Sequence, residues 1–189
     1  MTSGTEFRNA LVCWFTGLSG AGKSSVAEET RRRLVANGLE VLILDGDWVR
    51  EKMHRHLGFS RSEIEENNRL IAEYCAKNRD RHDIILVPII SPYESSRQSA
   101  RNLLMPNFHV IYCAADLAVV AKRDTKGLYE KAARGDIDNL IGFSPKSPYE
   151  PPPAPDLRLD TGSASLKSAV DSLVGYIDAH MGNAAQDVK

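Results

Sequence analysis

The chain has 189 residues, of which 26% are charged and 42% hydrophobic, and its formal net charge is −1. This length and balance predict one globular domain and exclude a wholly disordered chain, a coiled coil or a disulfide scaffold as a description of the whole. A general nucleic-acid binder usually carries a basic excess, so no nucleic-acid partner is expected. No apolar run reaches the roughly 18 residues of a membrane span. We therefore expect no membrane partner. Because the cysteines are few and odd in number, we also expect a cytoplasmic protein with reduced thiols.

Apolar runs alternate with segments of helical periodicity along most of the chain. Strands are expected at residues 11–16, 41–44, 83–87, 108–113 and 157–160. Helices are expected at residues 24–37, about 47–56, 60–78, 94–104, 116–122 and 166–180. Ser60 and Glu63 have the spacing of a capping box at the start of the third helix. This alternation predicts the α/β class, with a parallel sheet and right-handed crossovers.

The segment between residues 124 and 155 is charged and rich in glycine and proline, and six of the nine prolines lie between 145 and 155. A loop of this length in a compact domain is usually functional. We therefore expect a lid over about residues 123–155, with the prolines as its rigid return limb. The predicted domain covers residues 1–181, and residues 182–189 are expected to form a frayed tail.

Residues 17–24 read G-L-S-G-A-G-K-S and fit the phosphate-binding pattern G-x-x-x-x-G-K-[ST], with an apolar strand before and a helix after. Glycines let backbone N–H groups turn inward toward an anion, and the helix N-terminus adds partial positive charge. Lys23 is expected to bridge the β- and γ-phosphates of ATP, and Ser24 to bind Mg²⁺. The predicted ATP-binding residues of this segment are Gly17, Leu18, Ser19, Gly20, Ala21, Gly22, Lys23, Ser24 and Ser25.

Further motifs narrow the class of nucleotide-binding protein. The chain has no N-K-x-D string to read guanine and is too short for a motor's extra elements, which leaves a small-metabolite kinase. Asp45 and Asp47 follow the second predicted strand, where they can orient an acceptor hydroxyl or hold a Mg²⁺ water. The alternative is a turn in which Asp47 caps the next helix. Arg50 fits either a salt bridge with Asp47 or an anion clamp.

A series of motifs carries a family resemblance. The phosphate-binding segment is followed by L-D-G-D-W-V-R (44–50), L-G-F-S (57–60), I-S-P-Y (90–93) with Arg97, R-D-T-K-G-L-Y-E-K-A (123–132), G-D-I (135–137), Y-E-P-P (149–152) and P-D-L (155–157). In order and spacing, over about residues 11–161, this series resembles the adenylyl-sulfate (APS) kinases.

The resemblance implies transfer of the ATP γ-phosphoryl group to the 3′-hydroxyl of adenylyl sulfate, giving PAPS and ADP. It also implies a P-loop kinase fold, with five parallel strands and helices on both faces, and a homodimer. By matching position, Arg123 is expected near the ATP base and Lys126 in the lid. Catalytic roles are implied for Lys23, Asp45, Asp47, Ser91 and Lys126, and Mg²⁺ binding for Ser24 and Asp45. Binding of the nucleotide-like acceptor is implied for Asp47, Arg50, Asn67, Ile89, Ile90, Ser91, Lys126 and Leu140.

Five positions depart from the family pattern on the acceptor side. Where the family has two arginines, this chain has Ile64 and Leu70. Where the family has two phenylalanines that stack on the acceptor adenine, it has Ile89 and Leu140. The family's asparagine is Trp48 here. Base–aromatic stacking contributes about 1–3 kcal/mol per base, so losing both faces would weaken adenine binding.

Three functions therefore stay open. APS kinase activity fits if Trp48, Phe143 or Tyr149 supplies another aromatic face. A related kinase of another nucleotide conjugate, such as a cytidine diphospho conjugate in polysaccharide decoration, accounts for the same replacements. The third alternative is a module that binds ATP without transferring phosphate.

Overall fold

A five-stranded parallel sheet forms the centre of the computed structural model, which describes residues 9–184. The strands are β1 (Leu11–Thr16), β2 (Val41–Ile43), β3 (Ile84–Val87), β4 (Phe108–Cys113) and β5 (Leu157–Leu159), in the spatial order β2-β3-β1-β4-β5. All six residues of β1 are buried, as expected for a central strand covered on both faces. The predicted α/β class with a parallel sheet is confirmed.

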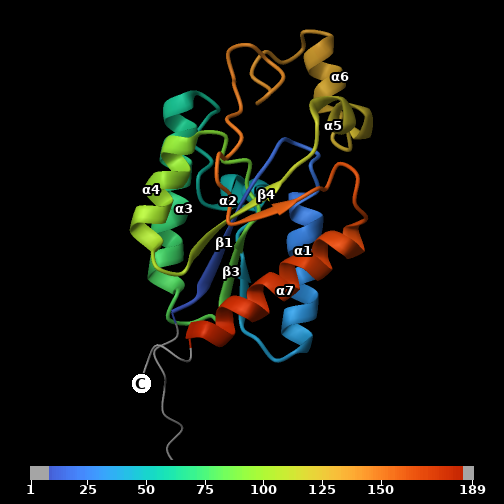
Figure 1. Cartoon of the computed structure of the whole chain (residues 1–189). Coiled ribbons are helices and arrows are strands. Elements are labelled where there is room, and N and C mark those ends of the chain that lie inside the picture. Colours follow the sequence, from blue (N-terminus) through green and yellow to red (C-terminus); the bar gives the residue numbers. More distant parts are fainter. Residues whose placement is uncertain (1–8, 185–189) are drawn as a thin grey trace, which may run out of the picture.

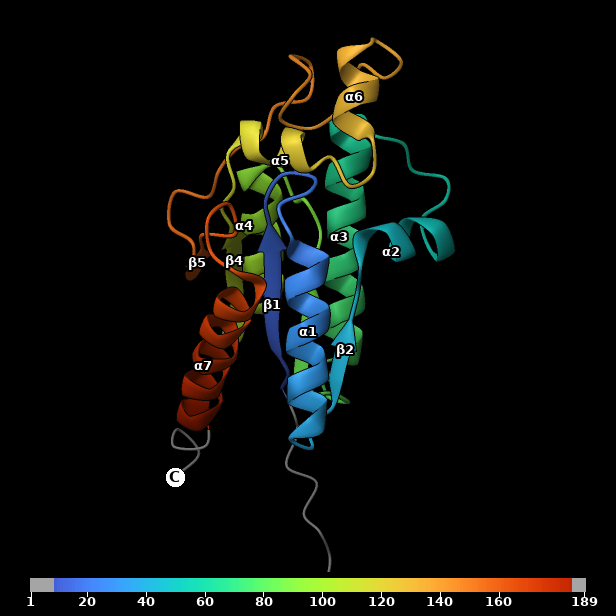
Figure 2. The same cartoon turned by 90° about the vertical axis from the view of Figure 1, so that its right-hand side faces the viewer.

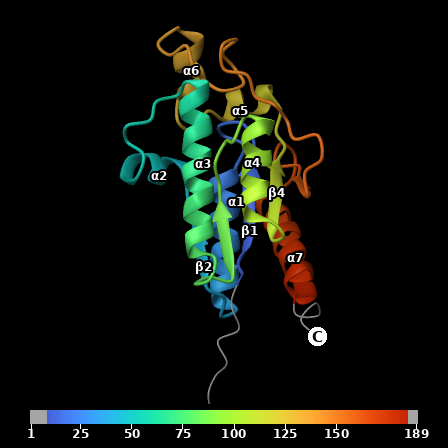
Figure 3. The ribbon, with the colours of Figure 1, turned by 90° about the vertical axis from the view of Figure 1, so that its left-hand side faces the viewer.

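Helices cover both faces of this sheet. They are α1 (Lys23–Ala36), α2 (Gly46–Lys52), α3 (Arg61–Asn78), α4 (Glu94–Leu104), α5 (Leu117–Arg123), α6 (Leu128–Ala133) and α7 (Leu166–Ala184). Figure 2 shows α1 and α7 on one face, and Figure 3 shows α3 and α4 on the other. The predicted capping box is present at the start of α3, where the Ser60 and Glu63 side chains each accept the other's backbone N–H.

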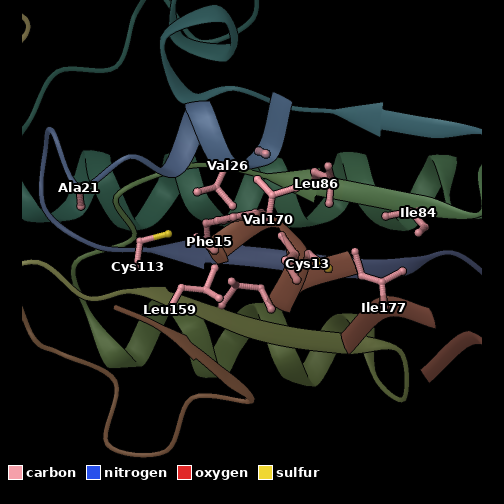
Figure 4. Packing of buried hydrophobic residues seen from close by; sticks show 14 of the residues in the cluster. Cys13, Phe15, Ala21, Val26, Ile84, Leu86, Cys113, Leu159, Val170 and Ile177 are labelled. Atoms are coloured by element: carbon pink, nitrogen blue, oxygen red, sulfur yellow. The ribbon is translucent and has the colours of Figure 1, made fainter. Parts of the chain in front are cut away.

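Side chains of β1 contribute alternately to two apolar cores, because successive residues of a strand point to opposite faces. Cys13 and Phe15 pack with residues of α1 and α7, as Figure 4 shows. Val12 and Trp14 pack with residues of α3 and α4. The strand is therefore fixed from both sides, and so is the start of the loop that leaves its carboxyl end.

One helix was not expected from the sequence. The segment 124–155 was predicted to be a long loop, but α6 forms within it. The carboxylate of Asp124 accepts the backbone N–H groups of Tyr129 at 3.1 Å and Glu130 at 2.9 Å, so it satisfies donors in the first turn of α6. The glycine and proline content of the whole segment concealed this short, locally capped helix.

Two other predicted helix boundaries differ by more than one residue. The second helix ends at Lys52, four residues before its predicted end, and its N-cap is Asp45 rather than Asp47. At the other end of the chain, α7 continues to Ala184, so the tail predicted to fray from residue 182 begins as helix. The rest of that predicted tail, residues 185–189, lies outside the described residues.

The carboxyl ends of the strands lie at one end of the molecule, beneath α5 and α6 (Figures 1 and 2). The loops that follow β1, β2 and β3 begin at this end, which is where ligands bind in open α/β sheets. Among residues 9–184, no helix combines the length and the apolar character that a membrane crossing requires.

Candidate active site

A cavity of about 1020 Å³ opens at the carboxyl end of the sheet. It is lined by the loop after β1, the starts of α2 and α7, the middle of α3, the turn after β3 and the segment 123–141. The structure thus brings together most of the predicted site residues: Ser19, Gly20, Ala21, Gly22, Lys23, Ser24, Ser25, Asp45, Asp47, Arg50, Asn67, Ile89, Ile90, Ser91, Arg123, Lys126 and Leu140.

The loop between β1 and α1 is shaped by its glycines. Gly17, Gly20 and Gly22 have φ values of 145°, 75° and 87°, which L side chains rarely adopt. A Cβ on Gly17 would also lie 2.6 Å from the carbonyl oxygen of Cys113. Gly22 is the N-cap of α1 and offers no side-chain cap, so the first N–H groups of this 14-residue helix are available to an anion.

Lys23 lies at the centre of this loop. Its Nζ donates hydrogen bonds to the carbonyl oxygens of Gly17 at 2.8 Å and Leu18 at 2.7 Å, two predicted residues that do not themselves line the cavity. Burial lowers the pKa of the Lys23 ammonium to about 8. A bound anion such as a phosphate would offset this burial cost, because it stabilises the charged form of the lysine.

Asp45 connects the loop to α2. Its Oδ2 accepts a hydrogen bond from Ser24 Oγ at 2.7 Å, and its Oδ1 accepts the backbone N–H of Asp47 at 3.0 Å. Hydroxyl and carboxylate oxygens suit Mg²⁺, which usually takes one or two such protein groups and completes its shell with phosphate and water. The described residues contain no cluster of three or more His, Cys, Asp or Glu that could hold a metal, so Ser24 and Asp45 fit a shared protein–phosphate site rather than a closed cage.

Asp47 and the segment 123–155 are in direct contact. The ammonium of Lys126 forms an ion pair with Asp47 Oδ2. Arg123, at the end of α5, donates to the carbonyl oxygens of Thr161 at 2.8 Å and Gly162 at 3.1 Å, and so joins α5 to the loop before α7. The two cations of this segment therefore line the same cavity but contact different parts of the chain.

Ser91 is held in an uncommon conformation in the turn after β3. Its φ is 42°, its side chain is buried, and its Oγ accepts hydrogen bonds from Trp14 Nε1 at 3.0 Å and Asn68 Nδ2 at 3.1 Å. A serine nucleophile needs a neighbouring base to take its proton. Because Oγ instead receives two donors, these contacts favour a positioning role for Ser91.

Arg97 ties this turn to the return limb of the segment 123–155. The side chain is 1% exposed and donates to the carbonyl oxygens of Ser91 at 2.6 Å and Glu150 at 2.7 Å, and to Glu94 Oε2 at 2.6 Å. Glu150 Oε2 in turn accepts the backbone N–H of Glu94 at 2.8 Å. The role of Arg97 could not be predicted from the sequence, because its partner at residue 150 is 53 positions away along the chain.

Phe59 is the aromatic side chain that lines the acceptor side, and its role was missed from the sequence. Its ring is 53% exposed, and the Arg50 guanidinium lies 4.5 Å from the ring centroid. Arg50 also donates to the carbonyl oxygen of Gly58 at 2.8 Å, which fixes it beside Phe59 rather than in the i,i+3 salt bridge considered above. An exposed phenylalanine shortly after a short helix carrying an arginine was the available signal.

The three aromatic residues considered as replacements do not provide a face in the cavity. Trp48 is 47% exposed and does not contribute to the lining. Phe143 packs edge-on against Tyr129, with ring centroids 5.9 Å apart. Tyr149 directs its hydroxyl to Thr16 Oγ1 at 2.9 Å, and burial raises the pKa of that phenol well above its usual range.

Three of the five departures from the family pattern form an apolar part of the lining. Ile64 is buried in a cluster with Tyr93 and Ile141, and Ile89 and Leu140 are also buried and line the cavity. Leu70, by contrast, lies outside the cavity lining. We call the residues that line the acceptor side the acceptor wall: Arg50, Phe59, Ile64, Asn67, Ile89 and Leu140.

Comparison with known proteins decides the family. Residues 9–160 match the model of the adenylylsulphate kinase family. The chain belongs to this family. The adenylyl-sulfate kinase of Prochlorococcus marinus is 44% identical over 169 residues, which are 89% of this chain and 83% of that protein. The adenylyl-sulfate kinase of Halothermothrix orenii is 43% identical over 172 residues, 90% of this chain and 91% of its own length.

Solved structures agree with this family and fold. The APS kinase of Mycobacterium tuberculosis in complex with AMPPNP and APS has a TM-score of 0.83 and 35% identity, and the match covers 90% of this chain and 99% of the other. A hexameric APS kinase from Thiobacillus denitrificans has a TM-score of 0.67 at 27% identity, covering 93% of this chain and 30% of that one. These matches confirm the resemblance and the P-loop fold inferred from the sequence, and mark the chain as an ATP-dependent kinase.

Proposed function

We propose that this adenylyl-sulfate kinase family member transfers the γ-phosphoryl group of ATP to the 3′-hydroxyl of adenylyl sulfate, giving PAPS and ADP. The proposal rests on one cavity that contains both the predicted ATP site and the predicted acceptor site. Lys23 and Ser24 line the ATP side, and Arg50 and Phe59 line the acceptor side. Asp47, which lies between these pairs along the chain, also lines the cavity. The relatives named adenylyl-sulfate kinase support the choice of acceptor.

The ATP side works mainly by charge and position. The loop N–H groups and Lys23 would bind the phosphates, and Arg123 would lie toward the base, between α5 and the loop before α7. Ser24 and Asp45 would hold Mg²⁺, which neutralises phosphate charge when bound. Asp45 is already fixed by two hydrogen bonds, so little reorganisation is needed there.

Asp47 is the proposed acceptor of the hydroxyl proton as the acceptor oxygen bonds to the γ-phosphorus. Its ion pair with Lys126 implies an exchange of partners: Lys126 turns to the phosphates, and Asp47 is released to the acceptor hydroxyl. Lys23, Lys126 and Arg50 then offset the negative charge spread over the transferred group and the departing ADP.

Phe59 is the proposed platform for the acceptor base. Base–aromatic stacking contributes about 1–3 kcal/mol, and Arg50 beside the ring supplies a cation for an anionic group of the same ligand. The buried apolar residues of the acceptor wall would pack against the opposite part of the nucleotide.

We also propose that residues 9–184 form one P-loop kinase domain with a lid at residues 123–155, and that the enzyme is a cytoplasmic homodimer. The contact between Lys126 and Asp47 supports the lid, since it joins this segment to the opposite side of the cavity. Light scattering during size-exclusion chromatography measures the oligomer: a mass of two chains supports the homodimer, and a mass of one or six chains contradicts it.

Release of ADP from Mg-ATP tests the reaction. We expect turnover with adenylyl sulfate above the ATPase background, and a folded protein with no such turnover would overturn the proposal. PAPS formation, followed by chromatography, identifies the 3′-phosphorylated product. In the same assay, Asp47→Ala should abolish turnover, whereas a pure ATP-binding module would have none to lose.

A different nucleotide conjugate is the second candidate acceptor. It is favoured by the apolar side chains of Ile64, Ile89 and Leu140, which stand where the family pattern has one arginine and two phenylalanines. The combined variant Ile64→Arg, Ile89→Phe and Leu140→Phe should raise kcat/KM for adenylyl sulfate if these residues select against it. Faster turnover of a cytidine diphospho conjugate than of adenylyl sulfate by the unmodified enzyme would favour the second candidate.

A further inference from the structure

We infer that His54 is a positioning residue that selects which end of the Asn67 side-chain amide faces the acceptor. The inference rests on the proposed function, in which Asn67 lines the acceptor side of the cavity. His54 stands in the connection between α2 and α3 and, among the described residues, forms no hydrogen bond with the phosphate loop.

The two side chains form a fixed, buried pair. His54 Nδ1 lies 2.8 Å from Asn67 Oδ1, and the two residues are 6% and 4% exposed. The backbone N–H of His54 also donates to the carbonyl oxygen of Val49 at 3.0 Å, which anchors the histidine to the last turn of α2. Neither side chain has room to turn freely, so their hydrogen bond sets the orientation of both.

The chemistry of the pair decides its direction. An amide oxygen can only accept a hydrogen bond, so His54 Nδ1 must carry the hydrogen that it donates to Asn67 Oδ1. The Asn67 NH₂ group is then left for the cavity, and it has no hydrogen-bond partner among the described residues. Its neighbour Asn68 differs, because its NH₂ group already donates to Ser91 Oγ at 3.1 Å.

This arrangement makes Asn67 a donor toward the ligand. A donor suits the oxygens of a phosphate, a sulfate or a base carbonyl, and Arg50 on the same wall favours the same class of group. A residue at position 54 that could only accept would turn the amide over and present its oxygen instead. The acceptor site would then face an anionic or carbonyl oxygen with another oxygen.

Asparagine and aspartate have nearly the same shape, so substituting His54 by each of them separates these two cases. In His54→Asn, the new amide NH₂ can take the place of Nδ1 and still donate to Asn67 Oδ1. In His54→Asp, the new carboxylate can only accept, so Asn67 must turn its NH₂ toward residue 54. His54→Leu removes the hydrogen bond, and His56→Asn, at an exposed position two residues away, is the control.

Steady-state kinetics with Mg-ATP and adenylyl sulfate provide the readout. We expect the acceptor KM of His54→Asn and His56→Asn to stay within about threefold of the parent enzyme. His54→Asp and His54→Leu should raise it about tenfold or more, which corresponds to one lost polar contact of ~1.4 kcal/mol, while the ATP KM stays unchanged. Equal acceptor KM values for the Asn and Asp variants, or an equal rise in the ATP KM, would overturn the inference.

Nitrogen-15 NMR of the histidine ring tests the same inference without turnover. We expect Nδ1 of His54 to carry the hydrogen in the parent enzyme, and a bare Nδ1 would overturn the inference whatever the activity. A protonated Nδ1 in an enzyme that does not phosphorylate adenylyl sulfate would overturn the proposed function alone. The amide orientation would then still be supported.

Discussion

The phosphate loop and the acceptor wall face each other across one cavity but are built differently. The loop, residues 17–24, takes its shape from a contiguous stretch of backbone in which three glycines have positive φ. The wall collects side chains from α2, α3, the turn after β3 and the segments around residues 59 and 140. The ATP side is thus specified locally, whereas the acceptor side depends on packing between distant segments.

This difference predicts which substitutions abolish activity and which change the acceptor. Changing the loop removes phosphate binding and with it every activity. Changing one side chain of the wall leaves the loop intact and alters only which acceptor fits. Three of the five departures from the family pattern, Ile64, Ile89 and Leu140, lie in the acceptor wall and none lies in the loop, which accords with this division. The following substitutions test it, from the largest expected effect to the smallest.

Lys23→Met should have the largest effect. It removes the cation at the centre of the loop together with its hydrogen bonds to the Gly17 and Leu18 carbonyl oxygens. We expect kcat/KM for ATP to fall by about 10³-fold, the upper range for losing one charge-stabilising group. The exposed Lys122→Met is the matched control and should stay within about twofold. A fall of less than tenfold for Lys23→Met would contradict the assigned role.

Asp47→Asn should come next. It keeps the size of the side chain but cannot take a proton from the acceptor hydroxyl, so kcat should fall by about 10²-fold with little change in the ATP KM. Asp45→Asn is the comparison, because asparagine is also a good N-cap and α2 should remain intact. For Asp45→Asn we expect a higher Mg²⁺ requirement instead. Identical Mg²⁺ dependence in both variants would remove the division of labour between the two aspartates.

Arg97→Met tests whether the return limb depends on buried side-chain contacts. The substitution leaves the carbonyl oxygen of Glu150 without its arginine donor and the carbonyl oxygen of Ser91 with Thr16 Oγ1 alone, at 3.1 Å, and we expect it to lower the free energy of unfolding by ~2 kcal/mol. Arg101→Met, one turn later on α4, is the matched control because it pairs with Asp156, the residue directly after the return limb. Urea denaturation measures both.

The kinetics of the same two variants provide a second readout. We expect kcat to fall more for Arg97→Met than for Arg101→Met. Of these two arginines, only Arg97 donates a hydrogen bond to the Ser91 turn, which lines the cavity. Equal losses of kcat in the two variants would mean that the return limb, and not the turn, is what Arg97 supports.

The sequence predicted the two regions unequally for physical reasons. The strands, the loop and the capping box at Ser60 depend on neighbours along the chain, so their patterns are legible. Arg97 could not be placed, because its carbonyl partner at residue 150 is 53 positions away. Phe59 was overlooked for a different reason: Arg50 is near it along the chain, but its place in the cavity lining depends on the fold.

Tyr149→Phe should have the smallest effect. It removes one hydrogen bond between the return limb and Thr16 but keeps the buried ring, and Thr16 Oγ1 still donates to the carbonyl oxygen of Ile90 at 2.8 Å. We expect a loss of ~1 kcal/mol in the free energy of unfolding, with kcat/KM for both substrates within about threefold. Thermal or urea denaturation provides the first value and the ADP-release assay the second. A large fall in the acceptor kcat/KM would mean that the Tyr149 hydroxyl binds substrate, and the acceptor wall would then have to include the return limb.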